Sequence, residues 1–229
     1  MAKSLKSRFE TCDRSAMGQD EKDALKSDIL AAAEDGSAQA MYLAGRLYYE
    51  GFTVDQNYTE ARKWFERAAE LGEVGGHLYL GYCHFYGRNI PINYEKAFRE
   101  FTLAAEKGDH CALYKLGDMY RDGRFVVQDG GMALQYYQQA LSRVTPKSPD
   151  YPNIVSRIGH CLFRGIGCPP DLLSAMHHLN TAKEKCYALL IKGDPYAHLP
   201  LPGIKADLSA IESQLDKQLT PELQNVQYT

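Results

Sequence analysis

The sequence lacks several features that mark membrane, secreted and metal-binding proteins. None of its 229 residues falls in an apolar run approaching the roughly 20 residues that a membrane-spanning helix requires. The first residues contain no apolar stretch of the signal-peptide type. The zinc-binding spacings C-x-x-C and H-E-x-x-H are also absent. These absences predict a cytoplasmic protein with no membrane partner, no metal site and no cofactor.

A strong excess of charge of one sign is missing as well. The chain has 26 Lys and Arg against 29 Asp and Glu, which gives a formal net charge of −3. Such a balance creates no strong field that would attract nucleic acid or an anionic membrane. Hydrophobic residues make up 45% of the chain and charged residues 24%, as in ordinary globular proteins. We therefore expect a partner other than nucleic acid.

A pattern of small residues recurs along the chain. Three copies are separated by steps of 36 residues, and a fourth follows after a step of 42. The additional residues of the longer step fall within 142–152, where a Pro-containing loop can absorb them. Four copies in one phase predict a repeat protein. The recurring residues are Gly45, Gly81, Gly117 and Gly159; Gly51, Gly87, Gly123 and Gly165; Ala61, Ala97, Ala133 and Ala175; and Ala68, Ala104, Ala140 and Ala182.

Each copy has the pattern of two helices. In the first copy, Met41 and Leu47 lie on one face of a helix that Gly51 ends, because glycine adopts the left-handed C-terminal conformation without strain. A second helix then ends at Gly72. Gly45 lies inside the first helix, where glycine costs about 1 kcal/mol relative to alanine. We attribute this glycine to close approach of a neighbouring helix that carries residues of the Ala61 type.

The pattern A-x-x-x-L-G-x-x-Y-x-x-G, followed by K-A-x-x-x-x-x-A-A-x-x-G, resembles the Sel1-like repeat, a relative of the tetratricopeptide repeat. The clear matches are 40–72, 76–108 and 112–141, with a more divergent copy at 155–185. The resemblance implies an all-α, right-handed α-α superhelix, or solenoid, of helix-turn-helix repeats. It also implies a noncatalytic scaffold or adaptor that binds a protein or peptide segment in its concave groove.

The chain divides into caps and repeats on this basis. Residues 1–36 are expected to form an N-terminal cap with a partial repeat. Four repeats follow over 37–186, at about 37–72, 73–108, 109–141 and 152–186. Residues 187–219 are expected to form C-terminal capping helices, and 220–229 a frayed tail. The closing helix carries one apolar stripe, which consists of Ile204, Leu208, Ile211, Leu215 and Leu219.

The resemblance also selects the residues that line the groove, because first helices line the concave side of tetratricopeptide-type solenoids. The set is aromatic in the first two copies and charged in the last two, which suits a segment with apolar and acidic parts. Tyrosine and arginine are enriched in interface hot spots. Alternatively, some of these tyrosines pack between adjacent helices. The candidates are Tyr42, Arg46, Tyr49, Tyr79, Tyr82, Phe85, Tyr86, Tyr114, Lys115, Asp118, Arg121, Arg157, His160 and Arg164.

The six cysteines bear on a second hypothesis. Cys83 and Cys161 occupy core positions of the repeat, so we interpret the cysteines as small buried residues and free thiols. Some secreted relatives carry regular cysteine pairs and are associated with β-lactam binding or hydrolysis. The alternative function is therefore a small-ligand binder or hydrolase of that type, with Cys111, Asp118 and His160 as its candidates. No cysteine lies about eight residues from Cys111, which favours the scaffold. The sequence leaves the oligomeric state open.

Overall fold

The computed structural model describes residues 4–11, 16–194 and 196–226, and all regular secondary structure among them is α-helical. None of these helices is both long and apolar enough to cross a bilayer. The helices are α1 (Leu5–Thr11), α2 (Gln19–Glu34), α3 (Ala38–Glu50), α4 (Tyr58–Glu70), α5 (Val74–Tyr86), α6 (Tyr94–Glu106), α7 (His110–Asp122), α8 (Gly130–Leu141), α9 (Tyr151–Arg164), α10 (Leu172–Ile191) and α11 (Leu201–Val226).

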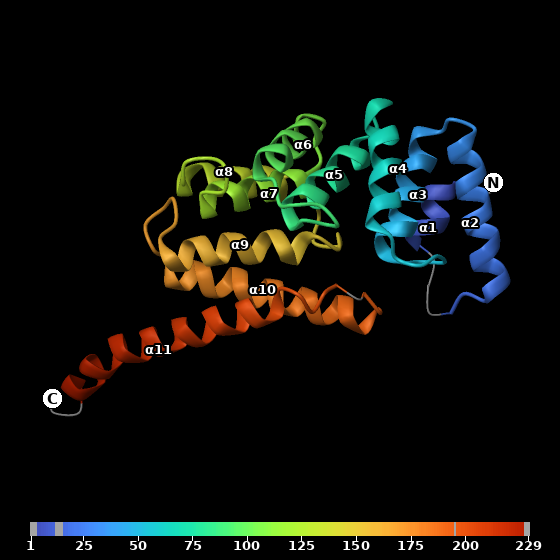
Figure 1. The fold of residues 1–229 in the computed structure, drawn as a ribbon. Coiled ribbons are helices and arrows are strands. Elements are labelled where there is room, and N and C mark those ends of the chain that lie inside the picture. Colours follow the sequence, from blue (N-terminus) through green and yellow to red (C-terminus); the bar gives the residue numbers. More distant parts are fainter. Residues whose placement is uncertain (1–3, 12–15, 195, 227–229) are drawn as a thin grey trace. The chain divides into compact units, whose positions relative to one another are not determined.

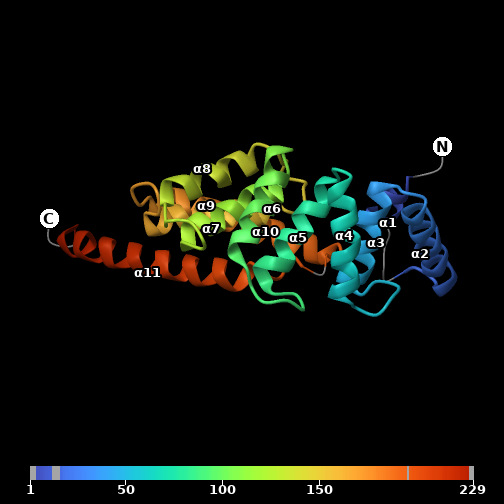
Figure 2. The ribbon, with the colours of Figure 1, turned by 45° about the horizontal axis from the view of Figure 1, so that its top comes forward.

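The chain forms two compact units whose boundary falls within α7, after Ala112. In the first unit each helix from α2 to α6 packs against its neighbours in the chain, and α1 packs against α2 and α3 (Figure 1). In the second unit α8 packs against α9, and α9 against α10. The long α11 packs against both α10 and α9, and Figure 2 shows it beside α10 from a second direction. This serial packing of helical hairpins confirms the predicted all-α solenoid class.

All four repeats use the same hairpin loop. The glycine that ends each first helix has a φ of 66° or 67°, in the left-handed region that glycine adopts without strain. Each second helix begins after an Asn or Asp whose side chain accepts a backbone N–H from the first turn, the standard N-cap interaction. The structure therefore confirms the repeat phase read from the sequence. The capping residues are Asn57, Asn93, Asp129 and Asp171.

The glycines inside the first helices lie against large side chains of the second helices. A Cβ placed on Gly45 would overlap the ring of Phe65, with Cδ1 at 2.5 Å. From the sequence we expected residues of the Ala61 type to lie opposite these glycines. The structure shows that this expectation was wrong, because the side chain opposite each glycine belongs to the residue four positions after the alanine. The equivalent pairs are Gly45 with Phe65, Gly81 with Phe101, Gly117 with Tyr137 and Gly159 with Leu179.

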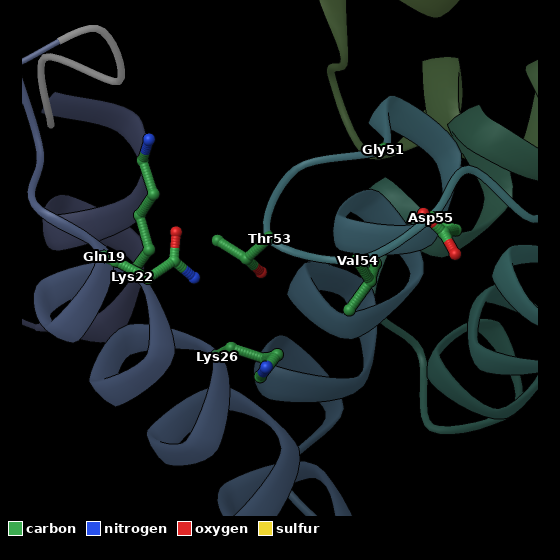
Figure 3. A pocket seen from close by; sticks show the side chains of 7 residues that line it. All are labelled: Gln19, Lys22, Lys26, Gly51, Thr53, Val54 and Asp55. Atoms are coloured by element: carbon green, nitrogen blue, oxygen red, sulfur yellow. The ribbon is translucent and has the colours of Figure 1, made fainter.

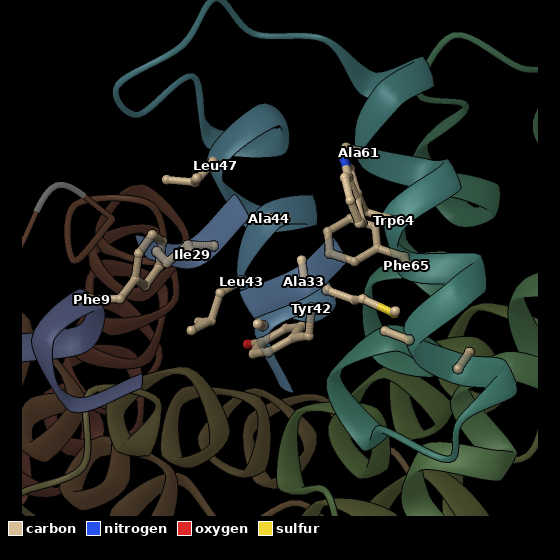
Figure 4. Close-up of a cluster of buried hydrophobic side chains, with 14 of the residues drawn as sticks. Phe9, Ile29, Ala33, Tyr42, Leu43, Ala44, Leu47, Ala61, Trp64 and Phe65 are labelled. Atoms are coloured by element: carbon tan, nitrogen blue, oxygen red, sulfur yellow. The ribbon is translucent and has the colours of Figure 1, made fainter. Parts of the chain in front are cut away.

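The N-terminal cap completes the core of the first unit (Figure 4). Phe9 of α1 and Ile29 of α2 are buried in one cluster with Leu43 and Leu47 of α3. The rings of Phe9 and Phe52 make an edge contact at 5.9 Å. Helix α2 packs against α3, in the place that the second helix of a preceding repeat would take.

The C-terminal cap completes the core of the second unit. Ile204, Leu208 and Ile211 of α11 are buried in a cluster with residues of α9 and α10, and Leu215 is partly buried against it. The predicted stripe is therefore confirmed for these four residues, whereas the side chain of Leu219 lies outside the described residues. The helix continues to Val226, beyond the end at residue 219 that the sequence indicated.

Two pairs of glycines lie at the starts of helices. Gly75–Gly76 and Gly130–Gly131 lie in the first turns of α5 and α8. A Cβ on Gly76 would lie 2.7 Å from the backbone N of Ala69 in α4. Gly76 is therefore explained by close backbone approach between α4 and α5.

Candidate interaction surface

The structure divides the fourteen predicted groove residues by exposure. Five are buried and offer little surface to a partner: Tyr42, Phe85, Tyr114, Lys115 and Asp118. Seven are half-buried: Arg46, Tyr49, Tyr79, Tyr82, Arg121, Arg157 and His160. Two are exposed: Tyr86 and Arg164.

A row of tyrosine rings runs across the first helices of the first unit. It consists of Tyr49, Tyr79, Tyr82 and Tyr86, and we call it the tyrosine row. Successive ring centroids are 5.1, 5.5 and 6.2 Å apart, within the range at which aromatic pairs stabilise a fold. Burial raises the pKa of Tyr49 to about 12, so its ring is neutral at physiological pH. The row ends at Tyr86, which is 44% exposed.

Arg46 joins the cap to the first two repeats rather than facing outward. Its Nη2 lies 2.6 Å from Oε1 of Glu50, and its guanidinium lies 4.7 Å from the ring centroid of Phe9. The guanidinium also lies 5.8 Å from the ring of Tyr79 in the next repeat. Burial lowers the pKa of Arg46, but the nearby Tyr79, Tyr42 and Glu50 outweigh that effect and raise it. Arg46 is therefore a structural cation.

Arg88 is the residue of this surface that the sequence did not single out. It follows the glycine that ends α5, and its guanidinium lies over the rings of Tyr58, Tyr86 and Tyr49 at 5.0, 5.5 and 6.0 Å from their centroids. The recurrence of a basic residue at this position, with Arg124 in the next repeat, was the available signal. Arg88 lies in a loop, so it is not among the positions of the first helices that the family resemblance indicates.

The charged candidates of the second unit form a buried network around Asp118. Arg157 donates two hydrogen bonds to this carboxylate, from Nε to Oδ1 at 2.7 Å and from Nη2 to Oδ2 at 2.9 Å. Tyr137 donates a third, at 2.9 Å. Burial raises the pKa of Asp118, but Arg157, Lys115 and Arg121 outweigh it and hold this pKa far below its usual range. The carboxylate is therefore a permanent anion and not a general acid.

His160 and Arg164 contact the closing helix. Nδ1 of His160 lies 2.7 Å from Oδ2 of Asp207 in α11, and Nη2 of Arg164 donates to Oδ1 at 3.3 Å. The position of His160 in the repeat is equivalent to those of Arg46 and Asp118, which also contact the next first helix. Helix α11 therefore takes the place of a fifth first helix. The successive contacts are Arg46 with Tyr79, Asp118 with Arg157 and His160 with Asp207.

The cysteines described in the structure form no disulfide with one another. Cys83, Cys161 and Cys186 are buried, and burial raises their pKa values to about 12, 11 and 11. Buried thiols with raised pKa values are poor nucleophiles. Cys111 is half-buried, and Cys12 lies outside the described residues. These three buried thiols agree with the interpretation of the cysteines as small core residues.

An open hollow lies between α2 and the loop that joins α3 to α4 (Figure 3). Its lining residues are Gln19, Lys22, Lys26, Gly51, Thr53, Val54 and Asp55. The amino group of Lys26 already donates to Asp23 at 2.9 Å. The lining contains no histidine or cysteine. We assign it no catalytic role.

Comparison with known proteins agrees with this architecture. The family model described as Sel1 repeat matches residues 38–73, 76–109, 112–143 and 156–185. No functionally curated protein matches the chain. Among solved structures, a Sel1 repeat protein from Oxalobacter formigenes is similar, with 27% identity and a TM-score of 0.62 over 70% of this chain and 62% of that one.

A second similar structure is a protective antigen present in uropathogenic Escherichia coli strains, which displays an SLR fold. It has 25% identity and a TM-score of 0.58 over 79% of this chain, but only 36% of that chain is covered. The present chain thus spans less than two thirds of either relative's length. The four family matches together cover more than half of the chain. The chain belongs to the Sel1 repeat family.

Proposed function

We propose that this protein is a noncatalytic scaffold or adaptor that binds a protein or peptide segment through the first helices of its first unit. Sel1 repeat proteins are generally protein-interaction scaffolds. The observation that carries the proposal is the tyrosine row, which ends in the exposed ring of Tyr86.

The tyrosine row has the properties of a binding surface. A tyrosine offers a large apolar face and a polar hydroxyl, and few of its rotatable bonds must be ordered on binding. An edge contact with Tyr79 at 5.5 Å and a tilted contact with Tyr86 at 6.2 Å hold Tyr82 in place. A partner therefore meets a preorganised surface, which lowers the entropy lost on association.

The proposed binding face is smaller than the groove that the sequence suggested, because it includes residues of the first unit only. In the second unit, Asp118 and Arg157 bind each other, and His160 and Arg164 bind α11. These side chains support the stacking of helices. The proposed contact residues are therefore Tyr49, Tyr79, Tyr82 and Tyr86.

The test is capture of the partner from native lysate with the full chain as bait. Tyr86→Ala is the informative variant, because removing a ring that is 44% exposed leaves the core intact. The matched control is Tyr187→Ala, which removes a ring in α10 that is 42% exposed. We expect Tyr86→Ala to lose the captured protein and the control to retain it, with both melting temperatures near that of the wild type. Equal capture by the two variants would refute the proposed surface.

A further inference from the structure

The arginines of the first unit differ in whether they pair with a carboxylate. Among its described residues, every arginine except Arg88 lies within 4.0 Å of a carboxylate oxygen. The pairs are Arg8 with Asp28, Arg46 with Glu50, Arg62 with Glu66, Arg67 with Glu34 and Arg99 with Glu95. Arg88 is thus the one described cation of its kind in this unit without an acidic partner.

The position of Arg88 is nevertheless fixed. Three tyrosines from α3, α4 and α5 surround its guanidinium, at 5.0 Å from the centroid of Tyr58, 5.5 Å from Tyr86 and 6.0 Å from Tyr49. Cation–π attraction of this kind stabilises the guanidinium in its position between the rings. Burial lowers the pKa of Arg88, but a hydrogen bond with Tyr49 and the nearby tyrosines outweigh it and raise this pKa. The side chain is therefore a preorganised, permanent cation.

The hydrogen-bonding capacity of Arg88 is only partly used. A guanidinium has five N–H donors. The donor on Nε of Arg88 is buried and closed to a partner, so the donors that a partner can use are those of the two terminal nitrogens. A planar carboxylate is the natural complement, because it accepts two parallel N–H bonds from a guanidinium. A single arginine supplies one positive charge, which matches a carboxylate, whereas recognition of phosphorylated groups typically uses clusters of arginines.

We propose that Arg88, held between Tyr49, Tyr58 and Tyr86, binds the side-chain carboxylate of an Asp or Glu in a linear segment of the partner protein. An apolar side chain next to that acid packs on the exposed ring of Tyr86. This inference rests on the proposed function and gives it a partner chemistry: an acidic segment that carries an apolar residue. Charge complementarity selects this occupant, since the surface offers a cation without a counter-ion beside an apolar ring.

The test begins with selection of 12-residue peptides from a random display library, with the full chain as bait. The tightest peptide is synthesised as selected and with its Asp and Glu residues replaced by Asn and Gln. Dissociation constants of both peptides are then measured for the wild type, Arg88→Gln, Arg88→Lys, Arg99→Gln and Tyr86→Ala. Arg99 is the matched control, because it is an exposed arginine of the same unit that already pairs with Glu95.

We expect the selected peptides to be enriched in Asp and Glu. Arg88→Gln should weaken the acidic peptide about tenfold, as for loss of a charge-assisted hydrogen bond, and leave the amide peptide unchanged. Arg88→Lys should retain part of the affinity, since it keeps the charge and loses the planar fork. Arg99→Gln should bind both peptides like the wild type. Melting temperatures establish that each variant is folded.

Three outcomes would overturn the inference. Selected peptides without acidic enrichment would refute it, as would an acidic peptide that Arg88→Gln and Arg99→Gln weaken equally. A library without any binder would also refute it, and the proposed function would then require a folded partner. If peptides lose affinity with Tyr86→Ala but not with Arg88→Gln, the inference fails and the proposed function stands. If Tyr86→Ala and Arg88→Gln both bind the peptides as tightly as the wild type, the inference and the proposed function are both contradicted.

Discussion

Alanine in place of the glycines inside the first helices should change the stability of the fold by an amount that depends on the side chain opposite each glycine. In Gly45→Ala the new Cβ would lie within 3.0 Å of three ring carbons of Phe65, whereas ordinary contact begins at 3.4 Å. Phe65 is fully buried, so the ring has little space to move. Overpacking of this kind costs up to about 3 kcal/mol, and the better helix propensity of alanine offsets about 1 kcal/mol. We expect a net loss of about 2 kcal/mol.

Gly159→Ala is the matched substitution at the equivalent position of the fourth repeat. Its Cβ would lie 2.9 Å from Cγ of Leu179, and an aliphatic side chain can change rotamer more readily than a ring can shift. The overpacking cost falls to about 1 kcal/mol, which the helix propensity offsets. Gly203→Ala in α11, with nothing within 4 Å of its Cβ, should stabilise by about 0.5 kcal/mol.

Urea unfolding followed by circular dichroism measures these differences as free energies of unfolding. The expected order of stability is Gly203→Ala, then Gly159→Ala, then Gly45→Ala. The reasoning is refuted if Gly45→Ala is as stable as the wild type, or if it and Gly159→Ala lose equal stability. Either result would mean that the glycines are retained for a reason other than the side chains opposite them.

Three further predictions follow from other contacts. Because the pKa of Asp118 is lowered in the folded state, its contribution to stability is present above its unfolded pKa of about 3.9 and is lost as pH falls toward the folded value. Asp118→Asn should therefore flatten the acid limb of the stability–pH curve and, by leaving Arg157 unpaired, cost about 3 kcal/mol at pH 7. Thr53 has a φ of 68°, which is strained for a β-branched residue, so Thr53→Asn should raise the free energy of unfolding by about 1 kcal/mol; Asn89 already occupies the equivalent place. Leu208→Asp places a charge in the core beneath α11, so limited proteolysis should cleave α11 in this variant and spare it in the wild type.

Features that repeat in phase could be predicted from the sequence. Gly51 and its three equivalents fixed the ends of the first helices, since a left-handed C-terminal residue leaves a recognisable glycine. The apolar stripe that includes Ile204 and Leu208 predicted the closing helix for a similar reason, because its spacing reflects one buried face. Each of these patterns lies within a single helix, so it can be recognised without knowing which helices pack against that helix.

The contacts between repeats could not be predicted in the same way. Arg46, Asp118 and His160 occupy equivalent positions, yet their partners are an aromatic ring, an arginine and a carboxylate on the following helix. Helical phase places such residues on one face, but it does not say whether the next helix covers them. Arg88 escaped prediction because it lies in a loop and because the three rings around it come from different helices.

Helix α11 has a consequence for how chains of this type change in length. It contacts the fourth repeat as another first helix would, through Asp207, and it packs against both α9 and α10. The first helix of a repeat added directly after the fourth would need the same surface. Such an addition would have to displace α11, whereas a copy inserted between existing hairpins would leave this contact intact.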